Sequence, residues 1–297
     1  MKKLLYLIFG IALLAIAGNA SATTDWYGPA HSPGVSQDWF TASNWSLGVP
    51  DIALQATQGG VRTYGGTNYD TSLTTCPIIS SGAATTLEVR VGGANAGTPA
   101  TATTAYLTMN SGSLSTQNFL MIGPDSATGG GRSGTVVMHG GNMILGGAQN
   151  GVRTSGHLYV GFGSGTYTGI VGTLTMDGGT IDAGGDFAIG KNYSQGYVNP
   201  SGTATILANN FFMRPDNAAA VANIDISGAA KVVINGDKRT TIETYIDNGW
   251  IKTNGVAWTD YTNLSYNAGT NKTTLMVPEP ATICLLGIGL FGLIRRK

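Results

Sequence analysis

Charge and cysteine are scarce in this sequence, and each shortage excludes classes of protein. Asp, Glu, Lys and Arg make up 11 % of the 297 residues, where roughly 25 % is usual. The chain has no cluster of Lys and Arg of the kind that neutralises phosphates, so we expect no nucleic-acid partner. Its 2 cysteines, Cys76 and Cys284, are too few for a disulfide framework or a cysteine zinc site.

Familiar nucleophile and phosphate motifs are also missing. No Gly-x-Ser-x-Gly sequence occurs in the chain, and Cys76 lies in no histidine context that suggests a catalytic thiol. The glycine-rich stretch 161–165 opens no apparent helix, which a phosphate cradle requires. We therefore expect no nucleophilic hydrolase, no nucleotide use and no cofactor.

Three aspartates are the candidates for any catalysis. Asp177, Asp182 and Asp186 could converge at one corner and serve a polysaccharide lyase or glycoside hydrolase, which needs paired carboxylates or carboxylate-held calcium. Asp beside Gly is also a common turn former. The stretch lacks the glycine spacing of calcium-binding nonapeptides, so we predict no metal. His139 and His157 are interpreted as isolated surface histidines, because no carboxylate pattern accompanies them.

Glycine, by contrast, is abundant and belongs to a repeat. The 45 glycines are about twice the usual ~7 %. Four phrases align: AYLTMNSGSL (105–114), GTVVMHGGNM (134–143), GTLTMDGGTI (172–181) and, more weakly, GTATILANNF (202–211). The alignment places Met109, Met138, Met176 and Ile206 in one column, with separations of 29, 38 and 30 residues.

A second phrase alternates with the first along the chain. It reads LEVRVG (87–92), FLMIG (119–123), LYVG (158–161) and FAIG (187–190). Alternation of apolar and small polar residues is the period of a strand with one buried face. Each phrase therefore predicts a short strand that ends at a glycine turn.

Short strands, glycine corners and a repeat of this size predict an all-β fold. We expect a right-handed parallel β-helix, or β-solenoid, in which like strands stack and like side chains form ladders. The alternative is a β-sandwich with irregular hairpins, because many short strands also describe that fold. The longer spacing of 38 residues is attributed to a loop insertion at 147–156.

The flanks predict a division of the chain into five parts. We expect a signal peptide at 1–22, an N-terminal capping region at 23–80 and the repetitive solenoid at 81–239. A C-terminal cap of a short helix and a hairpin is expected at 240–277, before a hydrophobic sorting helix at 278–297. The helix is predicted by Ile242, Tyr245, Ile246 and Trp250, which lie at roughly helical spacing.

The N-terminus has the form of a secretory signal peptide. Met1-Lys2-Lys3 precedes an apolar stretch at 4–17, and Ala20 and Ala22 complete an Ala-x-Ala site. We expect signal peptidase to cut after Ala22 and the protein to be exported through the inner membrane.

The C-terminus has a different pattern. Pro278-Glu279-Pro280 precedes the apolar run 281–294, and the chain closes on Arg295, Arg296 and Lys297. The run would span about 21 Å as a helix, against a hydrocarbon core of about 30 Å. It is therefore a marginal permanent transmembrane span, although an ordinary C-terminal anchor is the alternative.

These C-terminal residues resemble the PEP-CTERM sorting signal of Gram-negative bacteria that make exopolysaccharide or biofilm. The resemblance rests on Pro278, Glu279, Pro280, the apolar run and the basic end. It implies transient insertion in the inner membrane and recognition by the exosortase, a processing protease. It also implies delivery to the cell envelope, cell surface or extracellular space. The body resembles, in style, bacterial surface β-helix proteins of the autotransporter-passenger type.

Together these features favour a structural or adhesion protein of the cell surface or extracellular matrix, without enzymatic activity. Exopolysaccharide or other envelope components are the partners that this interpretation implies. The alternative is a polysaccharide lyase or glycoside hydrolase on a β-helix scaffold. An enzyme should have a groove where carboxylates and a basic residue converge.

Overall fold

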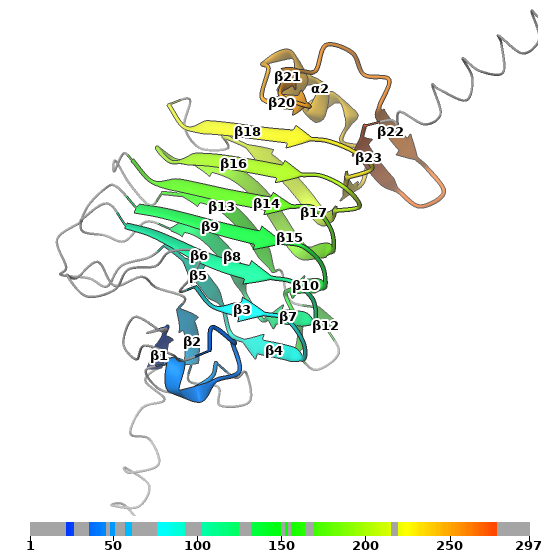
Figure 1. Cartoon of the computed structure of the whole chain (residues 1–297). Helices are drawn as coiled ribbons and strands as arrows, with labels where there is room; N and C mark the ends of the chain where they lie inside the picture. Colours follow the sequence, from blue (N-terminus) through cyan, green and yellow to red (C-terminus); the bar gives the residue numbers. More distant parts are fainter. Residues whose placement is uncertain are drawn as a thin grey trace, which may run out of the picture.

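The computed structural model describes residues 22–26, 36–45, 48–50, 57–60, 76–92, 103–124, 132–149, 152–153, 156–163, 169–214 and 219–277. These residues form a 13-stranded sheet, here called the large sheet, and an 8-stranded small sheet. The strands within each sheet pair mainly in parallel (Figure 1). The predicted all-β class with parallel strands is therefore confirmed. Residues 1–21 of the predicted signal peptide and the predicted sorting helix lie outside the described residues.

Successive passes of the chain build both sheets together. The small sheet contains β3 (Ile78–Ile79), β6 (Thr103–Met109), β9 (Arg132–Met138), β14 (Val171–Met176), β16 (Gln195–Pro200), β18 (Val221–Ile226), β20 (Ile251–Thr253) and β21 (Val256–Ala257). The large sheet contains β1 (Ala22–Asp25), β2 (Thr57–Gly60), β4 (Ala83–Thr86), β5 (Val89–Val91), β7 (Ser113–Thr116), β8 (Phe119–Pro124), β10 (Asn142–Leu145), β13 (His157–Phe162), β15 (Thr180–Lys191), β17 (Thr205–Met213), β19 (Lys231–Asn235), β22 (Leu264–Asn267) and β23 (Lys272–Met276).

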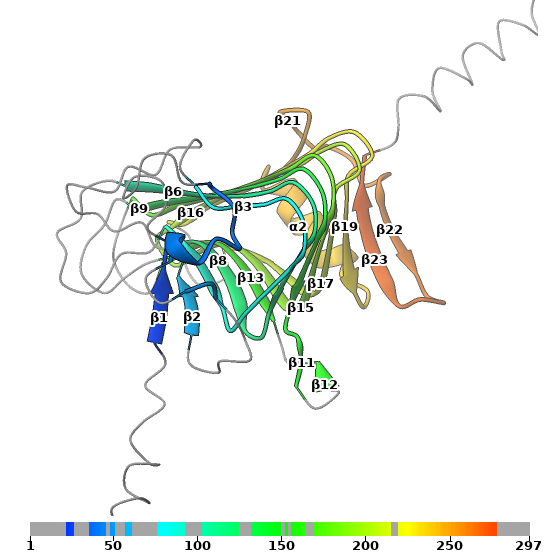
Figure 2. The same cartoon turned by 60° about the horizontal axis from the view of Figure 1, so that its bottom comes forward.

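The chain alternates between the sheets, and each pass lies beside the one before it. From β6 it crosses to β7 and β8, returns to β9, and repeats this path through β19. Figure 2 shows the two sheets facing each other, joined by turns. Among the described strands, antiparallel pairing is confined to β11–β12, β20–β21 and β19–β23–β22. The irregular hairpins of the sandwich alternative therefore do not describe the pairing in the body.

The insertion expected at 147–156 contains a small hairpin. Its strands are β11 (Ala148–Gln149) and β12 (Val152–Arg153), which pair antiparallel. The hairpin separates β10 from β13, whereas the next pass crosses the same width as the single strand β15. The extra residues therefore leave the stacking of the sheets unchanged.

Alternate side chains of each strand enter a core between the sheets. In the small sheet Met109, Met138 and Met176 are paired neighbours and fully buried, as the repeat predicts. The placement of Ile206 in this column is wrong, because Met176 pairs with Pro200. Ile206 instead belongs to a buried column of the large sheet, formed by Leu114, Met143, Ile181, Ile206 and Val232.

The second phrase is confirmed as a column of the large sheet. Its buried members are Val91, Ile122, Val160 and Ile189. A glycine with positive φ follows each of them; Gly123, for example, has φ 65°. This left-handed conformation turns the chain out of the large sheet, and glycine adopts it without the steric cost of a Cβ.

Glycines also bring the two sheets into close contact at one edge. Gly134, Gly172 and Gly196 are neighbours in the small sheet. A Cβ added at Gly172 would lie 2.1 Å from the backbone nitrogen of Gly161 in the large sheet. The column ends in Ala105 on one side and Ala222 on the other. Backbone thus packs directly on backbone in the middle of the stack.

Tryptophan packing organises the N-terminal end of the described chain. Trp45 packs edge-on against Trp26 and Trp39, with ring centroids 5.0 and 4.7 Å apart. The indole Nε1 of Trp45 donates to the Trp39 carbonyl at 2.8 Å, across the short 3-10 helix η1 (Ala42–Asn44). Nearby, β2 joins β1 to β5 and so extends the large sheet.

At the other end lie the helix and the hairpin expected there. Helix α2 (Arg239–Asp247) buries Ile242 and Ile246, one turn apart, against the core. Strands β22 and β23 pair antiparallel, and β23 continues the large sheet from β19. Figure 1 shows both features at the end of the stack opposite β1.

Candidate functional site

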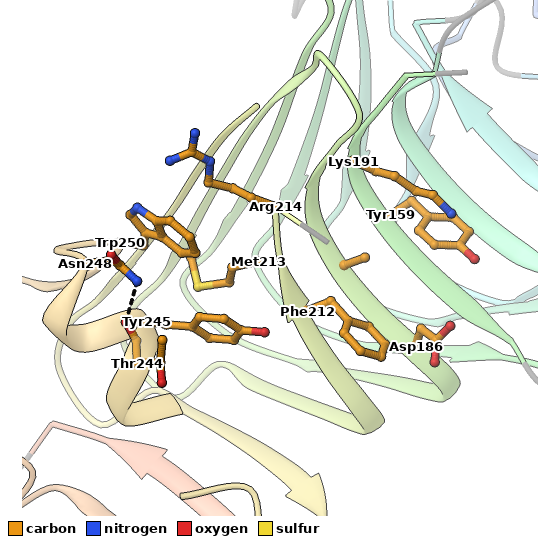
Figure 3. Close-up of a pocket in the computed structure, with 11 residues that line it drawn as sticks. Tyr159, Asp186, Lys191, Phe212, Met213, Arg214, Thr244, Tyr245, Asn248 and Trp250 are labelled. Carbon is orange, nitrogen blue, oxygen red and sulfur yellow. Dashed lines mark hydrogen bonds between the residues drawn. The ribbon is translucent and has the colours of Figure 1, made fainter. Parts of the chain in front are cut away.

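The outer face of the large sheet carries a cavity of about 570 Å³ beside α2, a volume typical of ligand pockets. Its walls come from β13, β15 and β17 on one side and from α2 and the residues after it on the other (Figure 3). The lining residues are Tyr159, Asp186, Ala188, Lys191, Phe212, Met213, Arg214, Thr244, Tyr245, Asn248 and Trp250. We call this cavity the outer groove.

Strand register builds the sheet side of the outer groove. Tyr159 pairs with Ala188, and Ala188 pairs with Phe212, so the three form one outward column across β13, β15 and β17. The Phe212 side chain is 37 % exposed. In Figure 3 Tyr159 and Phe212 lie on opposite sides of the groove. Alanine between two aromatic residues leaves a hollow in the column.

The end of α2 builds the opposite side. Gly249 follows the helix with φ 69°, and the N–H groups of Gly249 and Trp250 donate to the carbonyls of Ile246 and Tyr245 at 2.8 and 3.1 Å. This is the Schellman pattern that ends many helices. It returns Trp250 to Tyr245, and their rings stack with centroids 5.7 Å apart.

Two cations lie over aromatic rings at the outer groove. The Arg214 guanidinium carbon is 4.9 Å from the Trp250 ring centroid. The Lys191 ammonium is 5.6 Å from the centroid of Tyr159 and 5.2 Å from that of Phe162. Both distances are within the range of cation–π attraction. The rings therefore hold positive charge at two places along the lining.

One carboxylate lies among these groups, and its neighbours already engage it. Asp186 Oδ1 accepts a hydrogen bond from the Asn210 amide at 3.0 Å. Its Oδ2 lies 3.3 Å from His157 Nδ1, which also accepts from the Asp186 backbone N–H at 3.1 Å. The lining thus carries two cations and one carboxylate held by the sheet.

Tyr245 brings a hydroxyl to the outer groove in its neutral form. Partial burial raises the pKa of the Tyr245 hydroxyl above its ordinary value, while a backbone hydrogen bond at Met213 acts in the opposite direction. The hydroxyl extends from α2 toward the sheet (Figure 3). It is therefore protonated at neutral pH and able to donate a hydrogen bond.

The three candidate aspartates have different surroundings. Asp177 lies 2.8 Å from His139 Nδ1, at a turn between β14 and β15. Asp182 lines a separate hollow of about 120 Å³, and Asp186 lines the outer groove. Among the described residues, no group of three or more His, Cys, Asp and Glu is placed to hold a metal ion. The structure assigns the aspartates no shared partner.

The interpretation of the histidines as isolated is wrong. His139 and His157 each lie beside an aspartate of the next pass, Asp177 and Asp186 respectively. The aspartates are 38 and 29 residues further along the chain. Stacking of successive passes places these residues together, so no local carboxylate pattern is visible around either histidine.

Sequence reasoning missed the outer groove, although a signal for it was present. The groove residues follow the buried position in the second phrase: Tyr159 in LYVG, Ala188 in FAIG and Phe212 in the related stretch FFMR. Extending the phrase by one further pass would have aligned an aromatic, a small and an aromatic residue. The contribution of Trp250 has no such signal, because it depends on where α2 ends.

Most of the predicted processing residues cannot be placed. Ala20, Pro278, Glu279, Pro280, Arg295, Arg296 and Lys297 lie outside the described residues. Ala22, the predicted last residue of the signal peptide, is the first residue of β1 and pairs with Thr57. Within the described ranges, no helix combines the length and the apolar character needed to cross a membrane.

Comparison with known proteins identifies the C-terminal segment and leaves the body without a described relative. No curated protein and no solved structure matched the chain. Residues 277–297 match the PEP-CTERM protein-sorting motif. The matched range contains Pro278-Glu279-Pro280 and the basic end that carried the resemblance. The chain therefore bears a PEP-CTERM sorting motif, which marks it as a protein exported and sorted, through the exosortase, to the cell envelope or surface.

Proposed function

We propose that the body is a β-solenoid that acts at the cell surface or in the extracellular matrix as a structural or adhesion protein, without enzymatic activity. The sorting motif supplies the location. The observation that carries the role is an uncharged outer face on the small sheet. Such a face suits lateral contact with neutral surfaces, because little charge must be desolvated when it is covered.

The uncharged face covers five consecutive strands of the small sheet. Its side chains alternate with the buried ones and are mostly half-buried. They form two columns of polar and aromatic residues: Tyr106, Thr135, Thr173, Tyr197 and Asn223, and beside them Thr108, Val137, Thr175 and Asn199. Repetition of one chemistry at the strand spacing of about 4.8 Å favours an extended contact over a single pocket.

The arrangement of the aspartates supports a role other than hydrolysis. Glycosidases use two carboxyl groups separated by roughly 5 to 9.5 Å across the scissile bond. The lining of the outer groove contains a single carboxylate, Asp186. Asp177 is paired with His139, and Asp182 lines a different hollow. The groove therefore lacks the pair of carboxylates that this chemistry needs.

The test compares surface attachment with catalysis. Cells that lack the protein should lose attachment to a neutral surface or retention of their matrix, and the wild-type chain should restore it. The purified full chain, incubated with acidic and neutral polysaccharides, should release no unsaturated or reducing ends. Normal attachment in the deleted strain would contradict the proposal, as would the release of such ends.

The enzymatic alternative keeps one supporting observation. Asp186, Lys191 and Arg214 share the outer groove, and a polysaccharide lyase needs an acidic and a basic group near its substrate. If the alternative holds, ultraviolet absorbance of unsaturated ends should increase with the wild-type chain. Asp186→Asn should then abolish the increase, while Asp177→Asn, remote from the groove lining, should not.

A further inference from the structure

We infer that the outer groove binds an acidic saccharide segment: Tyr159 and Phe212 flank a sugar ring over Ala188, and Arg214 with Lys191 receives its carboxylate. The inference deepens the proposed function and rests on it, because a surface or matrix role brings the protein to a glycan. It assigns the ligand contact to the large sheet, on the face that carries charge, and away from the uncharged face of the small sheet.

The width of the hollow suits a saccharide ring. Tyr159, Ala188 and Phe212 occupy adjacent strands in register, so the two aromatic positions are separated by about 9.6 Å, twice the strand spacing. Ala188 is nearly buried and contributes only a methyl group to the floor. A pyranose ring has apolar C–H faces that pack on aromatic rings, and its edge carries the hydroxyl groups.

The charge around the hollow favours an acid. Asp186 is engaged by Asn210 and lies beside His157, whereas Arg214 is held by the Trp250 ring. The Nε atom of Arg214 is buried and has no hydrogen-bond partner in the described part of the chain. A buried donor without an acceptor is costly, and a carboxylate is the group that an arginine fork binds best.

Polar groups of α2 complete the lining on the other side. Thr244, Tyr245 and Asn248 face the groove from this helix, and the Asn248 amide donates to the Thr244 carbonyl at 2.8 Å. That contact leaves the Asn248 side-chain oxygen as an acceptor, while the neutral Tyr245 hydroxyl is a donor. Sugar hydroxyl groups both donate and accept, so both kinds of group are useful here.

Two lining features distinguish this ligand from an apolar peptide. An apolar chain would cover Arg214 and Lys191 without supplying an acceptor, at the cost of desolvating both charges. It would also leave the Tyr245 and Asn248 polar groups unmatched. An acidic saccharide satisfies the cations, the hydroxyl and the rings together.

The binding experiment uses the full chain purified in a mild detergent. Isothermal titration calorimetry measures Kd for two acidic probes, oligogalacturonate and oligomannuronate, and for a neutral cello-oligosaccharide of equal length. We expect at least one acidic probe to bind at least tenfold more tightly than the neutral probe. A charge contact of this kind is worth about this factor or more.

Variants locate the binding within the molecule. Phe212→Ala should weaken the acidic probe by roughly five- to tenfold, as expected for loss of one ring contact. The matched control is Tyr193→Ala, since Tyr193 is 36 % exposed, close to the 37 % of Phe212, and lies outside the groove lining. Lys191→Gln and Arg214→Gln should each weaken the acidic probe about tenfold and leave the neutral probe unchanged. Lys231→Gln, an exposed lysine outside the lining, is their control.

The outcomes separate this inference from the proposed function. It is overturned if neither acidic probe binds, if the neutral probe binds as tightly, or if the groove variants bind like their controls. Loss of cell attachment on deletion, restored by the groove variants, would leave the structural role standing without this ligand. Circular dichroism of each variant shows that a loss of binding is not a loss of fold.

Discussion

At the scale of single residues, Cys76 is the clearest case of burial controlling chemistry. Its side chain is fully buried, and this raises the pKa of the Cys76 thiol, with smaller opposing contributions from a hydrogen bond with Thr108 and from its own backbone. The thiolate is the reactive form of cysteine. Folding therefore protects this residue in two ways, by limiting access and by keeping the proton on sulfur.

We predict that Cys76 reacts slowly with iodoacetamide at pH 8 in the folded protein and rapidly in denaturant. The raised pKa also sets a sign: stability from this group is complete below the ordinary thiol pKa and falls as pH rises through the folded-state value. Mass spectrometry of the Cys284→Ser variant measures alkylation of Cys76 alone. Equal rates in the folded and unfolded states would contradict the prediction.

At the scale of elements, the edge where the sheets meet depends on glycine. Gly172→Ala would place a methyl group about 2 Å from the backbone of β8 and β13, since the nearest atoms are Gly161 N at 2.1 Å and Ile122 O at 2.2 Å. Backbone atoms of paired strands cannot move aside without losing their hydrogen bonds. We expect a loss of stability of about 1–3 kcal/mol or more, as for other overpacked sites.

Gly147→Ala is the matched control for this prediction. Its Cβ would meet only the Thr116 carbonyl at an ordinary 3.6 Å. Alanine at a compatible glycine site is neutral or stabilises by up to about 1 kcal/mol. Urea denaturation followed by circular dichroism measures both variants. Equal midpoints for Gly172→Ala and wild type would show that the sheets do not meet as described.

At the scale of the whole molecule, sorting depends on the C-terminal motif. Replacing Pro278-Glu279-Pro280 with alanines should trap the protein in the inner membrane of a host that has the exosortase, because the recognised sequence is gone while the apolar run remains. Cell fractionation and immunoblotting measure the distribution. The wild-type chain in a host without the protease should be trapped in the same way; unchanged release of the variant would show that the tail is only an anchor.

Sequence reasoning predicted the strands better than their places in the two sheets. The period of two and the glycine turns were enough to predict an all-β chain and to align Met109, Met138 and Met176. Ile206 was misplaced because the pass shortens: the partner of Met176 is Pro200, 24 residues later, whereas the alignment assumed 30. The strands of both sheets share one alternation, so the pattern does not say to which sheet a strand belongs.

The sequence by itself determined where this protein goes and what its strands look like. A sorting motif is a contiguous segment, and strand alternation is a property of neighbouring residues, so both are readable along the chain. Only the tertiary structure decided which residues meet. Tyr159, Phe212 and Trp250 share a groove because strand register and the end of α2 bring them together, and His139 meets Asp177 because one pass stacks on the next. These contacts join residues tens of positions apart, and no local pattern encodes them.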